Sequence, residues 1–148
     1  MAALTDNDLL IRRLVYDRLL SGGGTPSKAS LASAADLTLV ETSASLQRLA
    51  DAHMLVLQRD GEILMANPFS AVPTPFVVSI GANSWHGNCI WDAMGIAAMA
   101  HREAVVEASC GCCGSAMTLR VPGDCTSDER LAHFAIPAAR WWDDIVFN

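Results

Sequence analysis

The sequence predicts an α+β protein: a winged-helix-like N-terminal module of three helices and a hairpin, followed by a small mixed β-sheet packed on helices. Three observations support this prediction. The first third of the chain shows helical spacing of apolar residues together with helix-capping signals. Short apolar runs around one longer apolar stretch fill the second half. Prolines at positions 68, 73 and 75 mark a boundary, which divides the chain into an N-terminal module of residues 1–67 and a catalytic or metal-binding domain of residues 68–148.

The first helix is expected over residues 6–20, where leucines recur at helical spacing. Thr5 and Asp8 form a plausible capping pair, because their side chains can bond the backbone amides that a helix start leaves without partners. The glycine triplet at 22–24 is expected to end this helix.

Two further helices are expected in the N-terminal module. The second opens at Thr25-Pro26, because a proline in the first turn lacks only a backbone N–H that has no partner there, and it runs to about Ala35. The third extends from about Glu41 to His53. Its apolar face is formed by Leu46, Leu49 and Ala50.

A β-hairpin is expected next, because apolar runs at 55–57 and 63–65 flank an Asp60-Gly61 pair. Three short helices and a hairpin are the outline of a winged helix-turn-helix, in which the third helix would read DNA. The alternative is a structural prop or a contact surface. Arg48 is the only formally basic residue of the third helix, against two acids, which favours the alternative.

The charge balance of the whole chain also disfavours nucleic acid as the main partner. Ten basic residues face sixteen acidic ones, so the formal net charge is −6. An acidic surface repels phosphate backbones and acidic membrane surfaces alike. A metal-responsive winged-helix regulator therefore stays only as a second alternative for the function.

Composition excludes several classes of protein. At 51% hydrophobic residues the chain is too apolar to be disordered, and no run approaches the roughly 18 apolar residues that span a membrane. The first ten residues carry acids rather than a basic stretch, unlike a secretory signal. We expect a cytoplasmic protein, in which thiols stay reduced, so metal or thiol chemistry explains the five cysteines better than disulfides do.

The second half is expected to place its cysteines at a helix start and in a turn between strands. The expected elements are a strand at 76–80, a loop at 81–88, an apolar helix at 89–101, strands at 105–106, 116–121 and 131–136, and a helix at 138–144. The cysteine-rich turn lies between the strands expected at 105–106 and 116–121.

Cys89 and Asp92 form the first candidate for a reactive site. If Cys89 opens a helix, Asp92 lies three residues on and shares its face. The free amides at a helix start stabilise a thiolate, so the pKa of Cys89 is expected to be lower than that of a free cysteine. A carboxyl group beside the thiolate can relay a proton if burial keeps it near neutral, and His86 is a candidate base. The alternative is a buried cysteine beside a helix-capping aspartate.

Cys110, Cys112 and Cys113 form the second candidate. Three thiols within four residues of a glycine-rich turn can converge on a soft metal ion such as Cu(I), Zn(II) or Hg(II). A closed zinc site needs a fourth ligand. The candidates for that ligand are Cys125, His101 and Cys89. The alternative is a set of small buried residues in a tight turn.

The ordered motifs of the second half match a known pattern. They are Phe76-Val77-Val78, the run from Trp85 to Met94 (WHGNCIWDAM), the run from Ser109 to Gly114 (SCGCCG), and the run from Met117 to Val121 (MTLRV). Together they resemble the bacterial organomercurial, or alkylmercury, lyases, a family that also carries a winged-helix-like N-terminal module without a DNA-binding role. The resemblance covers most of the chain, and its strongest part is Cys89-x-x-Asp92 followed by Ser109-Cys110.

This resemblance implies protonolysis of a carbon–mercury bond, with Cys89 and Asp92 in the catalytic positions. Thiolates would coordinate the mercury of R–Hg⁺, and the aspartate would pass a proton to the leaving carbon. The products would be R–H and Hg(II) held by sulfur and carboxylate. No cofactor is implied; the partners would be a small organometallic or thiol-reactive substrate and cellular thiols. The cysteine at the position of Cys110 looks structural in the family.

The chain departs from that family at the second catalytic cysteine, which follows an arginine and an aromatic stretch in those lyases. Here the corresponding region, residues 140–146, contains no cysteine. Two hypotheses would supply the missing ligand: Cys112 or Cys113 reaches the site, or Asp143 or Asp144 replaces the thiolate. If neither holds, the first alternative is a non-catalytic protein that binds soft metals through thiols, or different chemistry on the lyase scaffold.

Overall fold

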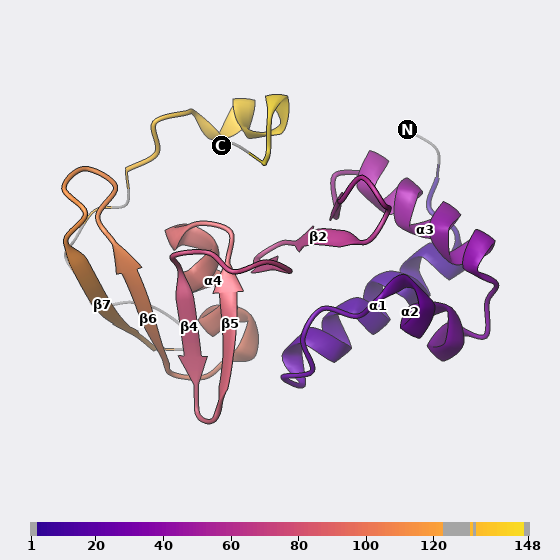
Figure 1. Cartoon of the computed structure of the whole chain (residues 1–148), viewed down its shortest axis with the longest axis horizontal. Helices are drawn as coiled ribbons and strands as arrows, with labels where there is room; N and C mark the ends of the chain where they lie inside the picture. Colours follow the sequence, from indigo (N-terminus) through magenta and orange to yellow (C-terminus); the bar gives the residue numbers. More distant parts are fainter. Residues whose placement is uncertain (1–2, 123–130, 132, 147–148) are drawn as a thin grey trace.

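One antiparallel sheet of seven strands connects the two halves of the molecule (Figure 1). The computed structural model describes residues 3–122, 131 and 133–146. The strand order is β1-β2-β3-β5-β4-β6-β7, and every pair of neighbours is antiparallel. The predicted α+β class is confirmed, but the mixed sheet is not. Strand β4 lies between β5 and β6, so the helical connection from β5 to β6 creates no parallel pair.

Helix α1 (Asp6–Leu20) begins with the predicted capping pair. Thr5 Oγ1 accepts a hydrogen bond from the Asp8 backbone amide at 3.3 Å, and the Asp8 carboxylate accepts one from the Thr5 amide at 2.8 Å. The same carboxylate, which is fully buried, accepts two hydrogen bonds from the guanidinium of Arg48 on α3 (Leu39–Asp51), at 2.7 and 2.9 Å. One side chain therefore caps α1 and joins it to α3.

The other two helix starts differ from the predicted positions because other residues cap them. Helix α2 (Lys28–Ala35) begins after Pro26, and its N-cap is Ser27, whose hydroxyl accepts a hydrogen bond from the Ser30 backbone amide. Helix α3 begins two residues earlier than predicted, because Thr38 forms a capping box with Glu41. It ends at Asp51 rather than His53, whose φ of 59° is left-handed.

The hairpin that follows the helices is as predicted, and the sheet continues beyond it. Strands β1 (Val56–Leu57) and β2 (Ile63–Ala66) pair with each other. Strand β3 (Phe69–Ser70) lies inside the segment interpreted as a linker, and it pairs with β2 on one side and β5 on the other. The sheet thus crosses the boundary placed at residues 67 and 68; a division into two domains there stays a prediction.

The second half is built of four longer strands and an apolar helix. They are β4 (Val77–Ile80), β5 (Asn83–Gly87), α4 (Ile90–Ala100), β6 (Ala104–Ser109) and β7 (Ala116–Val121). The loop predicted at 81–88 is wrong, because residues 83–87 form β5. Its polar side chains hid the strand in the sequence, although Trp85 and Gly87 are buried. The described residues of 131–136 form no strand, and the last helix is a 3-10 helix, η1 (Ala138–Asp143).

Helix α4 packs against β4, β5 and β6 and buries Ala93, Ile96 and Ala97. In Figure 1 it lies behind the β4–β5 hairpin, between the β6–β7 hairpin at one end of the molecule and α1 to α3 at the other. Although α4 is strongly apolar, no helix within the described part of the chain is long and apolar enough to cross a membrane.

A continuous core joins the two halves. The indole Nε1 of Trp85 on β5 donates a hydrogen bond to the Leu19 carbonyl at the end of α1, at 2.8 Å. Phe69 on β3 lies between the rings of Tyr16 on α1 and Trp85, with ring centroids 6.4 and 6.5 Å away. These contacts bury apolar area from both halves in one cluster, so the N-terminal helices support the sheet directly.

Candidate functional site

Cys89 is the N-cap residue of α4. Its backbone is extended, with φ of −145°, and its Sγ atom accepts a hydrogen bond from the Asp92 backbone amide at 3.5 Å. Serine, threonine, aspartate and asparagine are the residues that usually cap helices. A cysteine here places a sulfur atom at the positive end of the helix dipole, where the standard capping residues would offer only oxygen.

A close approach of β5 to α4 positions this cap. A Cβ atom on Gly87 would lie 2.7 Å from the Ala93 backbone nitrogen and 2.9 Å from its Cα, distances that real side chains do not adopt. Glycine therefore lets the end of β5 touch the first turn of the helix. Thr74 Oγ1 holds the Gly87 carbonyl at 2.6 Å, which fixes the strand end that leads to the cysteine.

The Cys89 thiol and the Asp92 carboxyl group are both half-buried at the start of α4, and each affects the pKa of the other. Burial is the main cause that raises the pKa of Cys89, and the negative charge of Asp92 raises it further against the backbone amides of the first turn. The expectation of an acidic Cys89 is therefore wrong, because desolvation and the neighbouring charge outweigh the helix start. Burial likewise raises the pKa of Asp92, against hydrogen bonds from Asn88 and Cys89.

Three residues behind Asp92 were not assigned any role from the sequence. The Asn88 amide donates to Asn67 Oδ1 at 3.1 Å and to the Pro68 carbonyl at 3.3 Å. The Tyr16 hydroxyl, from α1, donates to the Asn67 carbonyl at 2.8 Å and is close enough to Asp92 for the two charges to interact. Asn88 stands next to the motif cysteine, which was a usable signal; nothing local in the sequence points to Tyr16 or Asn67.

His86, the candidate base, is occupied by backbone groups. Its Nδ1 atom lies 3.2 Å from the Thr74 amide nitrogen and 3.1 Å from the Thr74 carbonyl oxygen. The ring therefore holds the segment before β4 against β5, and we assign it no proton-transfer role.

The cysteine-rich turn is the tip of the β6–β7 hairpin, as predicted. The Gly114 amide donates to the Cys110 carbonyl at 2.8 Å, and Cys112 and Cys113 are exposed. Cys113 Sγ lies 3.1 Å from Ser115 Oγ; that hydroxyl, helped by the Cys110 thiol, lowers the pKa of Cys113. The alternative of small buried residues in this turn is therefore wrong for Cys112 and Cys113.

The two cysteine regions lie at the same end of the sheet. Val77 of β4 pairs with His86 on one side and Glu107 on the other, so the residues that follow both partners leave the sheet at the same edge. One strand separates β5 from β6, which corresponds to about 10 Å between their backbones. Over residues 3–122, 131 and 133–146, no three His, Cys, Asp or Glu side chains gather closely enough to hold a metal ion. Cys89 and Asp92 are thus brought together, the three turn thiols stay apart from them, and Cys125 lies outside the described residues.

The C-terminal segment covers the start of α4 with aromatic rings. Trp91, which follows the motif cysteine by two residues, packs edge-on against Phe134 at 6.4 Å, and Phe134 packs against Trp141 at 5.1 Å. Asp143 pairs with Arg140 at 3.0 Å on the exposed side of this segment. Figure 1 shows the segment (yellow) running from the β6–β7 side toward the N-terminal helices.

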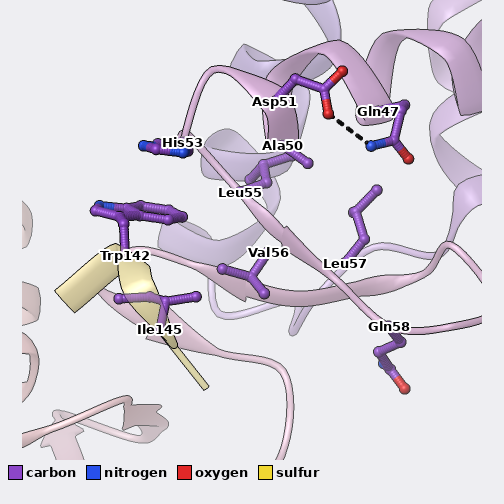
Figure 2. A pocket seen from close by; sticks show the side chains of 10 residues that line it. All are labelled: Gln47, Ala50, Asp51, His53, Leu55, Val56, Leu57, Gln58, Trp142 and Ile145. Carbon is purple, nitrogen blue, oxygen red and sulfur yellow. Dashed lines mark hydrogen bonds between the residues drawn. The ribbon is translucent and has the colours of Figure 1, made fainter. Parts of the chain in front are cut away.

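Beyond these contacts, the C-terminal segment reaches the N-terminal module. Trp142 stacks on His53 with ring centroids 4.1 Å apart and planes 6° from parallel. Figure 2 shows this stack at the rim of an open hollow of about 380 Å³ between α3, β1 and the segment. The side chains around it are Gln47, Ala50, Asp51, His53, Leu55, Val56, Leu57, Gln58, Trp142 and Ile145. Trp142 lines this hollow, whereas the neighbouring Trp141 packs against Phe134.

The helix proposed to read DNA has its one arginine engaged elsewhere. The Arg48 guanidinium makes a two-pronged contact with the buried Asp8 carboxylate and also bonds Ser45. A cation held this way is not presented to a phosphate backbone. Three helices and a hairpin are present, but the arginine of α3 joins this helix to α1.

Comparison with known proteins gives a family match and a similar solved structure. The sequence pattern of the family described as alkylmercury lyase matches residues 69–147, more than half of the chain. The chain belongs to the alkylmercury lyase family. The match includes β3 to β7, α4 and both cysteine regions. No curated protein matches the chain.

Among solved structures, the fold is similar to a crystal structure described as the mercury-bound form of MerB2. The two share 17% sequence identity with a TM-score of 0.67. The match covers 84% of this chain and 60% of that one, so the chain spans about three fifths of the length of the structure it resembles. The likeness extends to the fold of the N-terminal helices, which lie outside the family match.

Proposed function

We propose that this chain cleaves carbon–mercury bonds by protonolysis, with Cys89 as the nucleophile and mercury ligand and Asp92 as the proton shuttle. The observation that carries the proposal is the placement of Cys89 and Asp92 together at the start of α4, where the Cys89 sulfur accepts a hydrogen bond from the Asp92 backbone amide. Membership of the alkylmercury lyase family supports it. Mercury is the substrate's own metal, so no resident cofactor is involved.

The first step is exchange of the ligand on mercury. Burial and the adjacent charge keep the Cys89 thiol protonated in the resting site, so its proton must leave as sulfur binds R–Hg⁺. The neighbouring Asp92 carboxylate accepts that proton. The sulfur–mercury bond forms, the sulfur–hydrogen bond breaks, and the carboxylate becomes a carboxylic acid.

The second step returns the proton to carbon. Protonated Asp92 donates to the carbon bound to mercury, and the electron pair of the carbon–mercury bond becomes the new carbon–hydrogen bond. R–H leaves, Asp92 is a carboxylate again, and Hg(II) stays on sulfur. A half-buried carboxyl group with a raised pKa suits this step, because it holds a proton more readily than an exposed aspartate does.

Hg(II) held by Cys89 needs a second ligand. The β6–β7 hairpin leaves the same end of the sheet as α4, and Cys112 and Cys113 are exposed there. Soft metals prefer sulfur, so a cellular thiol is the favoured second ligand, and a turn thiol would serve only if the hairpin moved toward Cys89. Asp143 is disfavoured because its carboxylate already pairs with Arg140.

An arylmercurial assay tests the function. The reduced protein is incubated with phenylmercury and excess thiol, and benzene release is followed by gas chromatography. Release well above that of a Cys89→Ser variant is expected. Equal release from both proteins would overturn the proposal. A Cys112→Ser, Cys113→Ser double variant in the same assay tells whether the turn supplies the second thiol.

A second candidate function is binding of a soft metal without turnover. The favouring observation is that Cys110, Cys112 and Cys113 share one turn closed by the Gly114–Cys110 hydrogen bond, with Cys112 and Cys113 exposed. Two-thiolate sites suit Cu(I) and Hg(II). Stoichiometric Cu(I) binding that survives in Cys89→Ser and is lost in the double variant would establish it.

A further inference from the structure

The tip of the β6–β7 hairpin carries two thiols three residues apart within one closed turn. The Gly114 amide donates to the Cys110 carbonyl at 2.8 Å, which closes a single helical turn over residues 110–114. The Cys110 amide donates to the Ser115 carbonyl at 2.9 Å and ties this turn to the β6–β7 ladder. Gly114 lets the chain return to β7 because its φ of 70° is left-handed. Hydrogen bonds therefore fix the backbone that carries Cys110 and Cys113.

This turn brings Cys110 and Cys113 close to the separation of a disulfide. Residues three apart in a helical turn share one side of it, with Cβ atoms about 5–6 Å apart. A disulfide requires about 3.5–4.5 Å between the same atoms. A Cβ atom on Gly111 or Gly114 would meet nothing within 4 Å, so the turn has open space in which to tighten. Closing the pair needs only a small movement of an exposed hairpin tip.

The other pairings of the described cysteines are disfavoured by geometry. Cys112 and Cys113 are adjacent, and their Cα atoms, about 3.8 Å apart, are closer than the roughly 4.4–6.8 Å that a disulfide spans. Residues two apart in a helical turn do not face each other, which disfavours Cys110 with Cys112. Cys89 follows β5, whose backbone is about 10 Å from that of β6. The favoured pair is therefore Cys110 with Cys113.

The two thiols also differ in access, which gives them an order of reaction. Cys113 is exposed, whereas Cys110 is half-buried. Cys113 Sγ lies 3.1 Å from Ser115 Oγ, a distance at which the hydroxyl can donate to a thiolate. Thiolates are the nucleophiles of disulfide exchange, so Cys113 is suited to attack a disulfide from solution. Cys110 is then placed to attack the sulfur of Cys113.

We propose that Cys110 and Cys113 form a dithiol site that reacts with small-molecule disulfides, such as glutathione disulfide, and closes to a reversible disulfide. The Cys113 thiolate attacks one glutathione sulfur, a mixed disulfide forms, and the first glutathione leaves as a thiolate that takes up the Cys113 proton. The Cys110 sulfur then attacks Cys113, loses its proton and expels the second glutathione as a thiol. Two protein thiols are oxidised, and one glutathione disulfide is reduced to two glutathiones.

This reaction is independent of carbon–mercury cleavage, because neither Cys89 nor Asp92 takes part in it. It has a consequence for the turn as a ligand of soft metals. Once the pair closes, Cys112 is the one free thiol left in the turn, so oxidation would remove a multidentate thiolate site there.

Differential labelling of the wild-type protein tests the proposal without mercury. The reduced protein is incubated with excess glutathione disulfide, and the remaining thiols are blocked with light iodoacetamide. After reduction, heavy iodoacetamide marks the cysteines that were oxidised. The tryptic peptide 103–120 contains all three turn cysteines, and Cys125 lies in the next one. We expect the heavy label on Cys110 and Cys113 and the light label on Cys112, with no glutathione bound before reduction.

Two variants test the order of reaction. Without Cys110 the mixed disulfide is not resolved, so Cys110→Ser is expected to retain glutathione on Cys113 at a level about 10-fold above that of the wild-type protein. Cys112→Ser is the matched control and should close the pair as the wild-type protein does. Circular dichroism checks that both variants fold; if Cys110→Ser does not, the wild-type labelling decides alone.

Three results would overturn the proposal: no reaction of the wild-type turn with glutathione disulfide, glutathione that stays on Cys113 in the wild-type protein, or a heavy label on Cys112 or Cys125 in place of Cys110. None of these readouts involves benzene release. Failure of the proposed lyase function would therefore leave the dithiol site standing, and failure of the dithiol site would leave the lyase function standing.

Discussion

Asp8 and Asp92 occupy the same position in their helices, three residues after an N-cap, yet the pKa values of their carboxyl groups are shifted in opposite directions. At the start of α1 the cap is Thr5, and the buried Asp8 carboxylate also receives the Arg48 guanidinium, which holds its pKa far below the usual range. At the start of α4 the cap is Cys89, and the pKa of Asp92 is affected by a neutral thiol and a neutral amide instead of a cation. Burial therefore raises the pKa of Asp92.

The difference shows that the local pattern sets where a carboxyl group lies, while a residue far along the chain sets its charge. Arg48 is forty residues from Asp8 in sequence. With that cation, an aspartate three residues into a helix becomes a structural ion; without one, it becomes an acid that can hold and return a proton.

The largest expected effect separates the two carboxyl groups by function. Asp92→Asn keeps the shape of the side chain but cannot carry the proton, so benzene release should fall by about 100-fold or more. The melting temperature should change little. Asp17→Asn, an exposed aspartate of α1 that pairs with Arg13, is the matched control and should keep full activity. Comparable loss in both variants would mean that Asp92 has no special role.

The second effect separates them by stability. Asp8→Ala removes a cap and leaves Arg48 without its partner, so the free energy of unfolding should fall by about 2–3 kcal/mol. Urea titration followed by circular dichroism measures it. Asp17→Ala breaks only an exposed pair and should cost less than about 0.5 kcal/mol. A loss of that small size in Asp8→Ala would show that the buried pair is not needed.

A third test extends the comparison to the thiols. Cys113 is exposed and Ser115 lowers its pKa, whereas burial raises the pKa of Cys89. At pH 8, iodoacetamide should therefore alkylate Cys113 about 10-fold faster than Cys89, as measured by peptide mass spectrometry. Ser115→Ala should slow the reaction of Cys113, and Ser109→Ala should not. Faster labelling of Cys89 would contradict the assigned burial.

The smallest expected effect is the pH dependence that Asp8 contributes. Because its folded-state pKa lies below its ordinary value of 3.8, its stabilisation is present above that value and is lost as the pH falls below it. Between pH 5 and pH 3 the free energy of unfolding should fall by about 1 kcal/mol more in the wild-type protein than in Asp8→Asn. Equal decreases in the free energy of unfolding in both proteins would show that Asp8 does not contribute to acid unfolding.

The sequence predicts what local chemistry determines. The capping pair at Thr5 and Asp8, the cap at Cys89 with Asp92 on the same turn, and the hairpin that carries Cys110 all depend on neighbours within a few residues. The pKa of Cys89 was predicted in the wrong direction because burial is a property of the whole fold. Strand β5 was missed because polar residues alternate with its buried tryptophan, and its neighbours in the sheet are not visible in its own sequence.

The support of the site could not be predicted for the same reason. The bond from Tyr16 to Asn67 spans 51 residues, and no pattern in either segment indicates the other. The family resemblance led to the expectation that Cys89 and Asp92 are catalytic, and the structure adds the hydrogen bonds that join Asn88, Asn67 and Tyr16.

The sheet order has a consequence for how the site is made. Most neighbouring strands are joined by short turns, and all the polar groups of the site except Tyr16 lie between residues 67 and 92. Low sequence separation makes such contacts cheap in chain entropy and quick to form. During synthesis α1 leaves the ribosome before residues 67–92 do, so Tyr16 is already present when these residues emerge. Of these groups, the carboxyl group of Asp92 is the last to be synthesised.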